Sequence, residues 1–319
     1  MPLDFQIDHG APLLFVINDA SGHNSTEATC ADIEAELEAA GRTGELLTTL
    51  PAKLPDVARQ AAARAKASRS AVVAVGGDGT LNTVAQHAHA AGCAMGVVPQ
   101  GTFNYFARTH GIPDDTAGAV RALLVSSPQP VQVGSVNGKL FLVNASLGLY
   151  PVLLEDREAY KARFGRSRLV AIAAAFATLM REHRQLRLRI DLGGTLRDVR
   201  TPTLFVGNNR LQLEQVGMRE PGAADTGSIA AVVLRPIGTL AMLGLLLRGA
   251  FGSLGDAENV DYFDFHRMVV GPSMSYGRRR VKVACDGEVS WLRWPLEFRV
   301  AEMPLLLLKT QGSSPQDAG

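Results

Sequence analysis

Short apolar runs alternate with amphipathic stretches through the first 130 or so residues of the chain. Residues 12–17 (PLLFVI) are an apolar run that ends in the polar turn NDASG, and a stretch rich in Ala and Glu follows at 25–40. Apolar runs of this length predict buried strands, and the longer Ala-rich stretches predict helices. The same alternation predicts strands at 44–49, 71–75 and 94–98, and helices at 56–66 and from about residue 80. Strands that alternate with helices at this spacing predict a three-layer α/β/α domain with a parallel sheet.

Beyond about residue 130 the pattern changes to short segments in which apolar positions alternate with polar ones. Such segments occur at 131–148, 186–194, 201–208, 228–234, 267–271, 280–292 and 296–301. The dipeptides Asn137-Gly138, Gly193-Gly194 and Asp286-Gly287 within them are typical of tight hairpin turns. The second half therefore predicts an antiparallel β-sandwich, interrupted by helices at about 155–184 and 238–254.

These patterns give the expected domain boundaries. We expect the α/β domain at residues 1–132 and the sandwich at residues 133–302. The last segment, 303–319, is expected to return to the first domain and to end in a disordered polar tail, QGSSPQDAG.

The composition limits the partners and the location. Lys and Arg number 32 against 31 Asp and Glu, so the net charge of +1 provides no whole-protein field that would hold nucleic acid. The three cysteines lack the spacing of a zinc site or a disulfide framework. The first ten residues lack the features of a secretory signal, and the longest apolar stretches, at 169–180 and 240–247, are shorter than the roughly 20 residues that span a bilayer. We therefore expect a cytoplasmic protein that binds no nucleic acid.

A glycine-rich turn, Gly76-Gly77-Asp78-Gly79-Thr80, lies between a predicted buried strand and a predicted helix. Glycines let backbone N–H groups approach phosphate oxygens, and the amino terminus of the helix adds partial positive charge. A carboxylate there would repel phosphate unless a cation lies between them. Asp78 thus indicates either Mg²⁺ coordination or capture of a proton from an acceptor hydroxyl. The alternative is a purely structural turn in which Asp78 and Thr80 cap the helix.

Two other polar turns favour the ligand-binding interpretation. Asn18 follows the first predicted strand, and Gly101, Thr102 and Asn104 follow the strand at 94–98. Because the carboxyl ends of parallel strands share one edge of a sheet, we expect the three turns to meet in one crevice.

With these motifs the chain resembles the diacylglycerol kinase catalytic-domain family, which includes bacterial lipid kinases and the sphingosine and ceramide kinases. The motifs occur in the family's order: NDASG at 18–22, GGDGT at 76–80, VVPQGTFNYFAR at 97–108, VNASLGL at 143–149 and CDGE at 285–288. NAD kinases and phosphofructokinases carry turns similar to GGDGT, but its combination with GTFNYFAR and DGE is specific. The resemblance covers nearly the whole chain. It implies an NAD kinase/phosphofructokinase-like α/β domain, a sandwich domain and an active site in the cleft between them.

The resemblance also implies ATP and Mg²⁺ as cofactors and assigns residues to them. Residues 76–82 would hold the ATP phosphates, Asn18 and Thr102 would line the nucleotide site, and either Thr48 or Thr49 would assist. The expected nucleotide-binding set, with Thr49 as its second-strand member, is Asn18, Thr49, Gly76, Gly77, Asp78, Gly79, Thr80, Leu81, Asn82, Gly101, Thr102 and Asn104. Asp78 is also the expected Mg²⁺ ligand.

The family's proton acceptor is the Glu of its Asp-Gly-Glu motif, which falls on Glu288 here. Without the resemblance, residues 280–292 are a hairpin, and Glu288 is simply the first exposed residue of its return strand. With it, Glu288 accepts the proton of a lipid hydroxyl as the oxygen attacks the γ-phosphorus. Asp78 and Glu288 are thus the expected catalytic residues, and which of them takes the proton stays open.

The chain departs from the family at three positions. Tyr105 stands where the family usually has Asp, which removes a carboxylate from the expected site. Thr226, with Asp225 one residue early, stands where some bacterial members have an Asp that helps to bind a structural Mg²⁺, so we do not expect that metal. Asp19 replaces a Pro in the first motif, a change that affects turn stiffness more than chemistry.

Together these features predict an ATP-dependent lipid kinase, with diacylglycerol as the favoured acceptor and phosphatidic acid as the product. The alternatives are an NAD-kinase-like enzyme with a soluble substrate and a catalytically silent regulator that binds lipid or nucleotide. A lipid acceptor requires contact with a membrane, so we expect peripheral contact with its inner face. The apolar stretch 238–254 and the cluster Arg278-Arg279-Arg280 are candidates for it, although each also suits an ordinary packed helix or solvated loop. A homodimer is compatible with the family, but the sequence does not indicate one.

Overall fold

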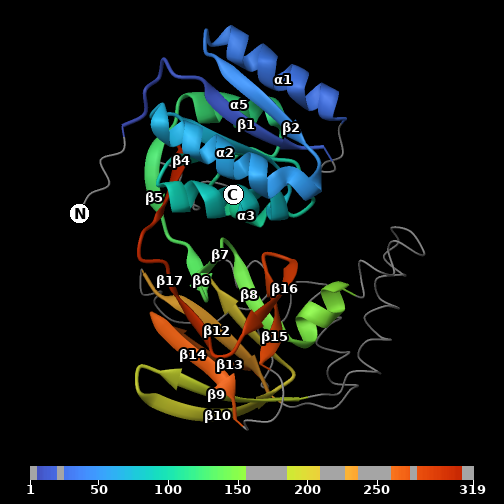
Figure 1. Cartoon of the computed structure of the whole chain (residues 1–319), viewed down its shortest axis with the longest axis vertical. Coiled ribbons are helices and arrows are strands. Elements are labelled where there is room, and N and C mark those ends of the chain that lie inside the picture. Colours follow the sequence, from blue (N-terminus) through green and yellow to red (C-terminus); the bar gives the residue numbers. More distant parts are fainter. Residues whose placement is uncertain are drawn as a thin grey trace. The chain divides into compact units, whose positions relative to one another are not determined.

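The computed structural model of the chain describes residues 6–19, 25–155, 185–208, 227–235, 260–273 and 279–310. The chain divides into two compact units (Figure 1). The first unit comprises Met1–Val133 together with Ala301–Gly319, and the second comprises Gly134–Val300. The chain thus leaves the first unit once and returns to it at its end.

The first unit is built on a six-stranded sheet with the order β2-β1-β3-β4-β18-β5. Its strands are β1 (Leu13–Asn18), β2 (Gly44–Thr49), β3 (Ala71–Gly76), β4 (Ala94–Pro99), β5 (Ser127–Val131) and β18 (Leu305–Lys309). The first four strands and β18 pair in parallel, whereas β5 runs antiparallel to β18. The expected α/β domain is confirmed, with the correction that its sheet is mostly parallel rather than wholly so.

Helices connect these strands and cover both faces of the sheet. They are α1 (Thr26–Ala39), the short 3₁₀ helix η1 (Pro51–Lys53), α2 (Leu54–Ala67), α3 (Asp78–Ala91), α4 (Tyr105–Thr109) and α5 (Thr116–Leu124). Helices α1 and α5 contact one another, as do α2 and α3 (Figure 1). Local chemistry sets their ends: Ser25 Oγ accepts the Ala28 N–H at the start of α1, and α3 ends at Gly92 in the left-handed conformation.

On the central strands, the residues that point to either face of the sheet are buried. Leu13, Phe15 and Ile17 of β1 share a core with residues of α1 and α5, which are Ile33, Leu37, Ala119, Val120 and Leu123. The strands β3 and β4 are buried along their whole length. Continuous burial explains why these strands appear in the sequence as apolar runs rather than as alternating patterns.

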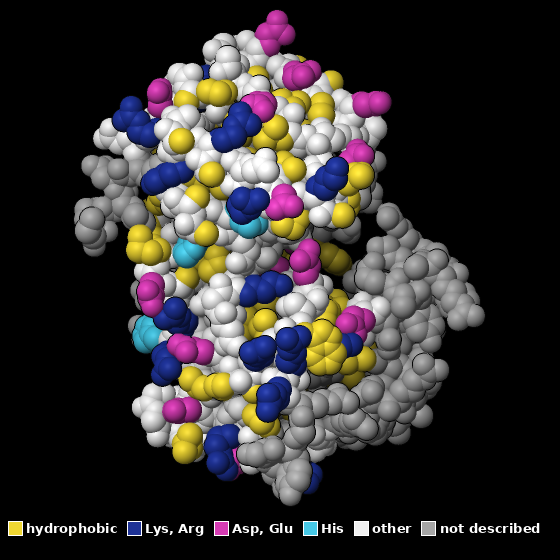
Figure 2. All heavy atoms as spheres, viewed as in Figure 1, with side chains coloured by type: hydrophobic (Ala, Val, Ile, Leu, Met, Phe, Trp, Pro, Cys, Tyr) yellow, Lys and Arg dark blue, Asp and Glu magenta, His cyan; other side chains and the backbone are white. Residues whose placement is uncertain are grey.

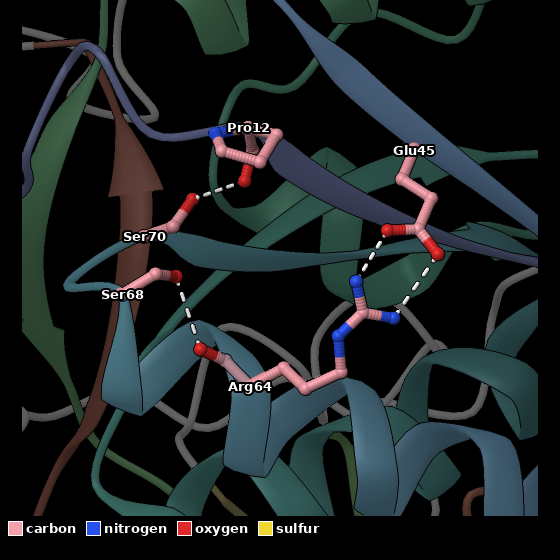
Figure 3. A network of polar contacts seen from close by, with 5 residues as sticks. All are labelled: Pro12, Glu45, Arg64, Ser68 and Ser70. Carbon is pink, nitrogen blue, oxygen red and sulfur yellow. Dashed lines mark hydrogen bonds and ion pairs between the residues drawn. The ribbon is translucent and has the colours of Figure 1, made fainter.

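Polar contacts connect the elements at the edge of the sheet where its strands begin (Figure 3). The guanidinium group of Arg64 in α2 forms two hydrogen bonds with the carboxylate of Glu45 in β2. Ser70 Oγ, just before β3, donates to the carbonyl oxygen of Pro12, just before β1, over 2.7 Å. Ser68 Oγ donates to the Arg64 carbonyl oxygen at the end of α2. These contacts hold α2 and β3 in place at the ends where the strands begin.

The second unit contains two antiparallel six-stranded sheets, with the orders β10-β9-β14-β17-β6-β7 and β13-β12-β11-β8-β15-β16. The first sheet contains β6 (Gly134–Val136), β7 (Lys139–Phe141), β9 (Leu186–Leu192), β10 (Thr195–Thr201), β14 (Arg267–Pro272) and β17 (Leu296–Val300). The second contains β8 (Asn144–Gly148), β11 (Thr203–Gly207), β12 (Ile229–Leu234), β13 (Val260–Phe265), β15 (Arg280–Cys285) and β16 (Glu288–Arg293). Residues from both sheets, such as Ile190, Phe298, Leu147 and Val283, share one buried core. The predicted antiparallel sandwich is therefore confirmed.

The three predicted hairpin turns are present. Asn137-Gly138 joins β6 to β7, Gly193-Gly194 joins β9 to β10, and Asp286-Gly287 joins β15 to β16. Both residues of each turn have positive φ angles, as two-residue type I′ turns require.

Several expectations fall on residues that the structure does not describe. Most of the predicted helix at about 155–184, the whole apolar stretch 238–254, Thr226 with Asp225, and the tail 311–319 lie outside the described residues. The three cysteines are free, and Cys93 and Cys285 are buried, whereas Cys30 is only half-buried. Among the described residues, no helix is long and apolar enough to cross a membrane.

Candidate functional site

The carboxyl ends of four neighbouring strands lie side by side at one edge of the first sheet. Asn18 at the end of β1 is the register partner of Thr49 at the end of β2, and Gly76 at the end of β3 is the partner of Pro99 at the end of β4. The turns at Gly76 and Gly101 follow two of these strands, and Asn18 ends a third. The structure therefore brings them to one sheet edge, where open α/β sheets bind their ligands.

The amino terminus of α3 is the centre of this edge. Gly77 is its N-cap residue and has no side chain with which to cap the helix. The first N–H groups of an α-helix have no partner within the helix, and their dipoles attract an anion. The N–H of Leu81 already donates to the Gly77 carbonyl oxygen over 3.0 Å. The amino terminus of α3 thus begins without a side-chain cap.

The turn at Gly101 lies directly against the turn at Gly77. A Cβ atom built on Gly101 would lie 3.0 Å from the Cα atom of Gly77 and 2.7 Å from Oδ1 of Asn104. The Gln100 N–H donates to the Gly76 carbonyl oxygen over 2.9 Å, which ties the two turns together. Position 101 therefore needs glycine, whereas a Cβ atom on Gly77 would make only an ordinary contact of 3.5 Å with the Gly101 Cα atom.

Asn104 holds the second turn from within. Its Oδ1 accepts the Gly101 N–H over 2.9 Å, and its own backbone is in the left-handed region with φ of 48°. Its Nδ2 donates to Oδ1 of Asp114 over 3.4 Å. Asn104 is buried, whereas Thr102 is exposed on the same turn. Asn104 thus shapes the turn, and Thr102 is the side chain free to contact a ligand.

The side chains of Asn18 and Thr80 meet across the first turn. Asn18 Nδ2 donates to Thr80 Oγ1 over 3.0 Å. Thr80 also fills the space beside Gly76, because a Cβ atom on Gly76 would lie 2.6 Å from its Oγ1. The glycine at 76 is therefore needed to admit Thr80, which in turn fixes Asn18 at the edge.

The two threonines at the end of β2, Thr48 and Thr49, point to opposite faces of the sheet. Register partners on neighbouring parallel strands point to the same face of a sheet, so Thr49 lies on the face of Asn18, which contacts α3. Thr48 points to the other face, where its side chain forms a hydrogen bond with Cys30 of α1. By placement, Thr49 is the threonine that accompanies Asn18.

Four further residues of the predicted set lie in or next to the first turn of α3. Asp78 and Gly79 are half-buried at the amino end, whereas Leu81 and Asn82 are buried. The Leu81 side chain is wholly buried in the core, and its N–H is already used within the helix. Leu81 therefore supports the turn by packing and has no group left with which to contact a ligand.

Tyr105 is the first residue of α4, next to the second turn. Its ring stacks on that of Phe103 with a centroid separation of 5.4 Å and an interplanar angle of 1°. Phe103 is exposed over 46% of its surface. An aromatic pair thus occupies the place where the family usually has a carboxylate.

The second cluster of site residues lies at the tip of the β15–β16 hairpin in the second unit. Asp286 accepts three backbone hydrogen bonds, from the N–H groups of Leu142, Val143 and Asn144, at 2.7, 2.8 and 3.0 Å. Its own N–H donates to the Asn144 carbonyl oxygen. Asp286 thus fastens the hairpin tip to the β7–β8 connection and fixes the position of Glu288 two residues later.

The environment of Glu288 is suited to a proton acceptor. Although Glu288 is an exposed residue, the surrounding protein displaces water from its carboxyl group and raises its pKa above the ordinary value. The positive charge of Lys139 opposes this rise, and the negative charge of Asp286 adds to it. Lys139 Nζ of β7 donates over 3.3 Å to Ser290 Oγ of β16, the strand that begins at Glu288. A carboxylate with a raised pKa holds a transferred proton more readily.

Sequence reasoning missed three residues of these clusters, which are Asp286, Lys139 and Asp114. The sequence indicates Asp286 only as a turn residue. The structure adds that its φ angle is positive, and a short Asp side chain in such a turn can accept hydrogen bonds from nearby backbone N–H groups. Lys139 and Asp114 gave no signal, because their partners Ser290 and Asn104 are brought to them only by the fold.

No metal cage is built from protein side chains alone in the described ranges, since no group of three His, Cys, Asp or Glu residues is placed to hold an ion there. Mg²⁺ in phosphoryl-transfer sites is commonly held by one or two carboxylates together with the substrate phosphates. One carboxylate, Asp78, stands at the amino terminus of α3 and fits that arrangement.

Comparison with known proteins agrees with the motifs. Residues 12–136 match the family model of the diacylglycerol kinase catalytic domain. The diacylglycerol kinase of Bacillus subtilis is 32% identical over 150 residues, which cover 44% of this chain and 47% of that protein. A Klebsiella pneumoniae protein named "Probable lipid kinase YegS-like" is 38% identical over 98 residues, which cover 30% of this chain and 33% of that protein. The aligned segments thus span a third to a half of these curated relatives.

The fold is similar over a greater length than the sequence. A crystal structure of a diacylglycerol kinase from Bacillus anthracis matches with a TM-score of 0.67 at 18% identity, covering 94% of this chain and 97% of that one. At that identity the likeness shows the fold. The resemblance to the diacylglycerol kinase family is confirmed by the family match at 12–136 and by these relatives.

Proposed function

We propose that the chain is an ATP-dependent lipid kinase, which transfers the γ-phosphoryl group of ATP to a lipid hydroxyl. Diacylglycerol is the favoured acceptor, and phosphatidic acid is then the product. The observation that carries this proposal is the bare amino terminus of α3, where Gly77 and Gly101 cross closely within the segment that matches the diacylglycerol kinase catalytic domain.

The first unit supplies the nucleotide side of the reaction. The N–H groups in the first turn of α3 are arranged to receive phosphate oxygens, and no side chain at Gly77 or Gly101 blocks their approach. Asn18, Thr49 and Thr80 add polar side chains on the same face. Asp78 is the residue that would hold Mg²⁺, which when bound neutralises charge on the β- and γ-phosphates.

The second unit supplies the base. Glu288 accepts the proton of the acceptor hydroxyl, and its raised pKa suits it to this task. Asp286 is a positioning residue, because it acts on Glu288 through the backbone of the hairpin. Phosphoryl transfer depends mostly on positioning and charge neutralisation. The loss of Glu288 should therefore slow the reaction more mildly than the loss of Asp78.

The proposal is tested by phosphoryl transfer from labelled ATP with Mg²⁺ to lipids in mixed micelles. The acceptors are diacylglycerol, a sphingoid base, ceramide and phosphatidylglycerol, with NAD as a soluble acceptor. We expect label in diacylglycerol, a loss of roughly 10²–10⁴ in kcat for Glu288→Gln, and no measurable turnover for Asp78→Asn.

Matched controls are Glu38→Gln and Asp32→Asn on the exposed face of α1, which should retain wild-type turnover. Label in NAD alone would show the soluble-substrate kinase instead. ATP binding without transfer to any acceptor would favour the silent regulator, and failure to bind ATP with Mg²⁺ would exclude both kinases.

A further inference from the structure

The β15–β16 hairpin has two faces of opposite character. In the register of this pair Arg280 lies opposite Arg293, and Lys282 lies opposite Trp291. Because register partners share a face, these four side chains lie on one face of the ribbon. The other face carries Val283 and Cys285, which are buried in the sandwich core, and Leu292, which packs against it. The face with the four side chains therefore points away from the core. We call it the basic ribbon face.

The two arginines of this face, Arg280 and Arg293, are exposed, as is Arg279 next to the face. In the described part of the chain none of the three guanidinium groups forms an ion pair. Arg280 and Arg293 stand directly opposite one another, an arrangement that costs stability between like charges. Such a cost is offset when a negatively charged partner binds.

The same three arginines line a hollow of about 500 Å³, whose fourth lining residue is Trp294. The guanidinium group binds phosphate oxygens through paired N–H donors. A hollow bordered by three such groups can receive a phosphate group, such as that of a phospholipid headgroup.

Trp291 gives the face its apolar part. It is exposed over 52% of its surface, and Lys282 Nζ lies 5.3 Å from its ring centroid. Lys282 also forms an ion pair with Glu155. Figure 2 shows Lys and Arg side chains gathering over this hairpin next to an apolar patch. Tryptophan prefers the boundary between headgroups and acyl chains, whereas Arg is drawn to anionic headgroups.

We propose that the basic ribbon face is a docking surface for membranes that contain anionic phospholipids. Its charge is complementary to such a surface, although the net charge of the whole chain is only +1. The inference rests on the proposed function in one respect, namely that a lipid acceptor brings the protein to a membrane.

Docking and catalysis are separable on this hairpin. Glu288 pairs with Cys285 at the turn, on the opposite face from Arg280 and Arg293. Five residues of strand separate Arg293 from Glu288, or about 17 Å at the usual rise per residue. Substitutions on the basic ribbon face therefore leave the contacts of Glu288 in place.

The test is co-sedimentation with vesicles of phosphatidylcholine, with and without phosphatidylglycerol. We expect the wild-type protein to bind the anionic vesicles and to bind phosphatidylcholine vesicles far less. Each Lys or Arg near an anionic surface strengthens binding by about fivefold. The triple variant Arg279→Gln, Arg280→Gln, Arg293→Gln should therefore lose on the order of a hundredfold in partitioning.

The matched control removes three other arginines of the same unit, in the variant Arg189→Gln, Arg235→Gln, Arg267→Gln. Each of these is already paired with a carboxylate, of Asp198, Asp261 and Glu297 respectively. The control changes the net charge by the same amount but should keep most of the binding. Urea unfolding, followed by tryptophan fluorescence, checks that both triple variants fold as the wild type does.

The tryptophans give a direct optical readout. Both tryptophans of the chain, Trp291 and Trp294, belong to this region. Their emission should shift to shorter wavelength when anionic vesicles are added, and Trp291→Phe should remove most of that shift. Added salt should weaken binding, because it screens exposed charges.

The proposed docking surface would be wrong if the two triple variants bound anionic vesicles equally, or if the wild-type protein did not bind them. Binding of inorganic phosphate through these arginines, by a protein that does not sediment with anionic vesicles, would also overturn it, since the hollow would then be a site for small anions. The kinase is judged separately in mixed micelles. Lipid phosphorylation without vesicle binding would overturn the docking surface alone, whereas ribbon-dependent binding without phosphorylation of any lipid would overturn the kinase alone.

Discussion

At the scale of single residues, the carboxylate of Asp286 shows how the hairpin tip is held in place. The backbone N–H groups of residues 142–144 donate hydrogen bonds to its two oxygens, with N···O distances of 2.7–3.0 Å. Each buried donor left without an acceptor costs about 1–3 kcal/mol. The side chain therefore supports both the stability of the second unit and the position of Glu288.

We expect Asp286→Ala to lower the free energy of unfolding of the second unit by roughly 3 kcal/mol, with Asp286→Asn losing less because its amide oxygen still accepts. Both should also lower kcat, since Glu288 is no longer held. Tryptophan fluorescence in urea reports on this unit, because Trp291 and Trp294 both belong to it. Asp191→Asn, which alters a single hydrogen bond to Gly194 in an exposed turn, should cost far less. An equal loss in that control would refute the capping role.

Substitution of Lys139 tests whether Glu288 is the base, through the pH dependence of kcat/KM. The charge of Lys139 lowers the pKa of Glu288 against the rise caused by desolvation. Lys139→Met should therefore raise this pKa further. Because the base must be deprotonated to act, the acidic limb of the kcat/KM profile should move to higher pH.

Ser290→Ala is the control for this shift, since it removes the hydrogen-bond partner of Lys139 but not its charge. Its acidic limb should stay near that of the wild type. A limb that does not move in Lys139→Met would show that Glu288 is not the group titrating in the profile.

At the scale of elements, the site of the first unit depends on the contact of two turns. A methyl group at position 101 would lie 3.0 Å from Gly77 Cα and 3.7 Å from the Asp78 nitrogen. The turn after β4 would have to move away from the amino terminus of α3. This would disturb the N–H groups proposed to bind phosphate.

Gly101→Ala should cost about 1–3 kcal/mol of strain, seen as a loss of tenfold or more in kcat/KM for ATP. Gly271→Ala in β14 is the matched control, since nothing lies within 4 Å of a Cβ atom there. Steady-state kinetics with ATP as the varied substrate distinguishes the two. Wild-type kinetics in Gly101→Ala would mean that the close approach of the turns has no role in binding ATP.

Elements also show where sequence patterns are informative. The pattern predicted β2 with the bounds that the structure has, and it found the three hairpins of the sandwich, because glycines and alternating residues encode these features locally. It missed α4 and α5, β10 and β13. Strand β10 has almost no buried residue, so it lacks the alternation on which such a prediction depends. Strand β5 contains two prolines, which obscured it.

At the scale of the whole molecule, the chain end completes the first unit. Strand β18 lies between β4 and β5, and four leucines at positions 305–308 are buried in it. Burial of a leucine contributes about 1.5–3 kcal/mol. Four of them are comparable with the whole net stability of a typical domain.

A chain that ends at Ala301 should therefore fail to fold its first unit, with loss of far-UV helical signal and of ATP binding. A chain that ends at Thr310 keeps β18 and is the control, and it should match the full-length protein in both measurements. Retention of helix and ATP binding by the shorter chain would show that β18 is dispensable.

The sequence by itself determined the alternation of strands and helices in the first unit, the two architectures and the motifs that match the diacylglycerol kinase family. It could do so because periodicity, turn residues and short motifs depend on neighbours along the chain. The expectation that Asn18, the turn at Gly76 and the turn at Gly101 lie at one sheet edge came from the strand pattern, and the other candidate site residues came from the family resemblance. Their roles, the membrane contact and any homodimer stay predictions.

Tertiary structure decided what depends on residues far apart in the chain. It placed Thr49 rather than Thr48 beside Asn18 and buried Leu81 in the core. It brought Asp286 to the N–H groups of residues 142–144. It also set Arg280 opposite Arg293 on an outward face and inserted the last strand between β4 and β5. Each of these follows from strand register and packing, which no local pattern encodes, because they are fixed only when the whole core closes.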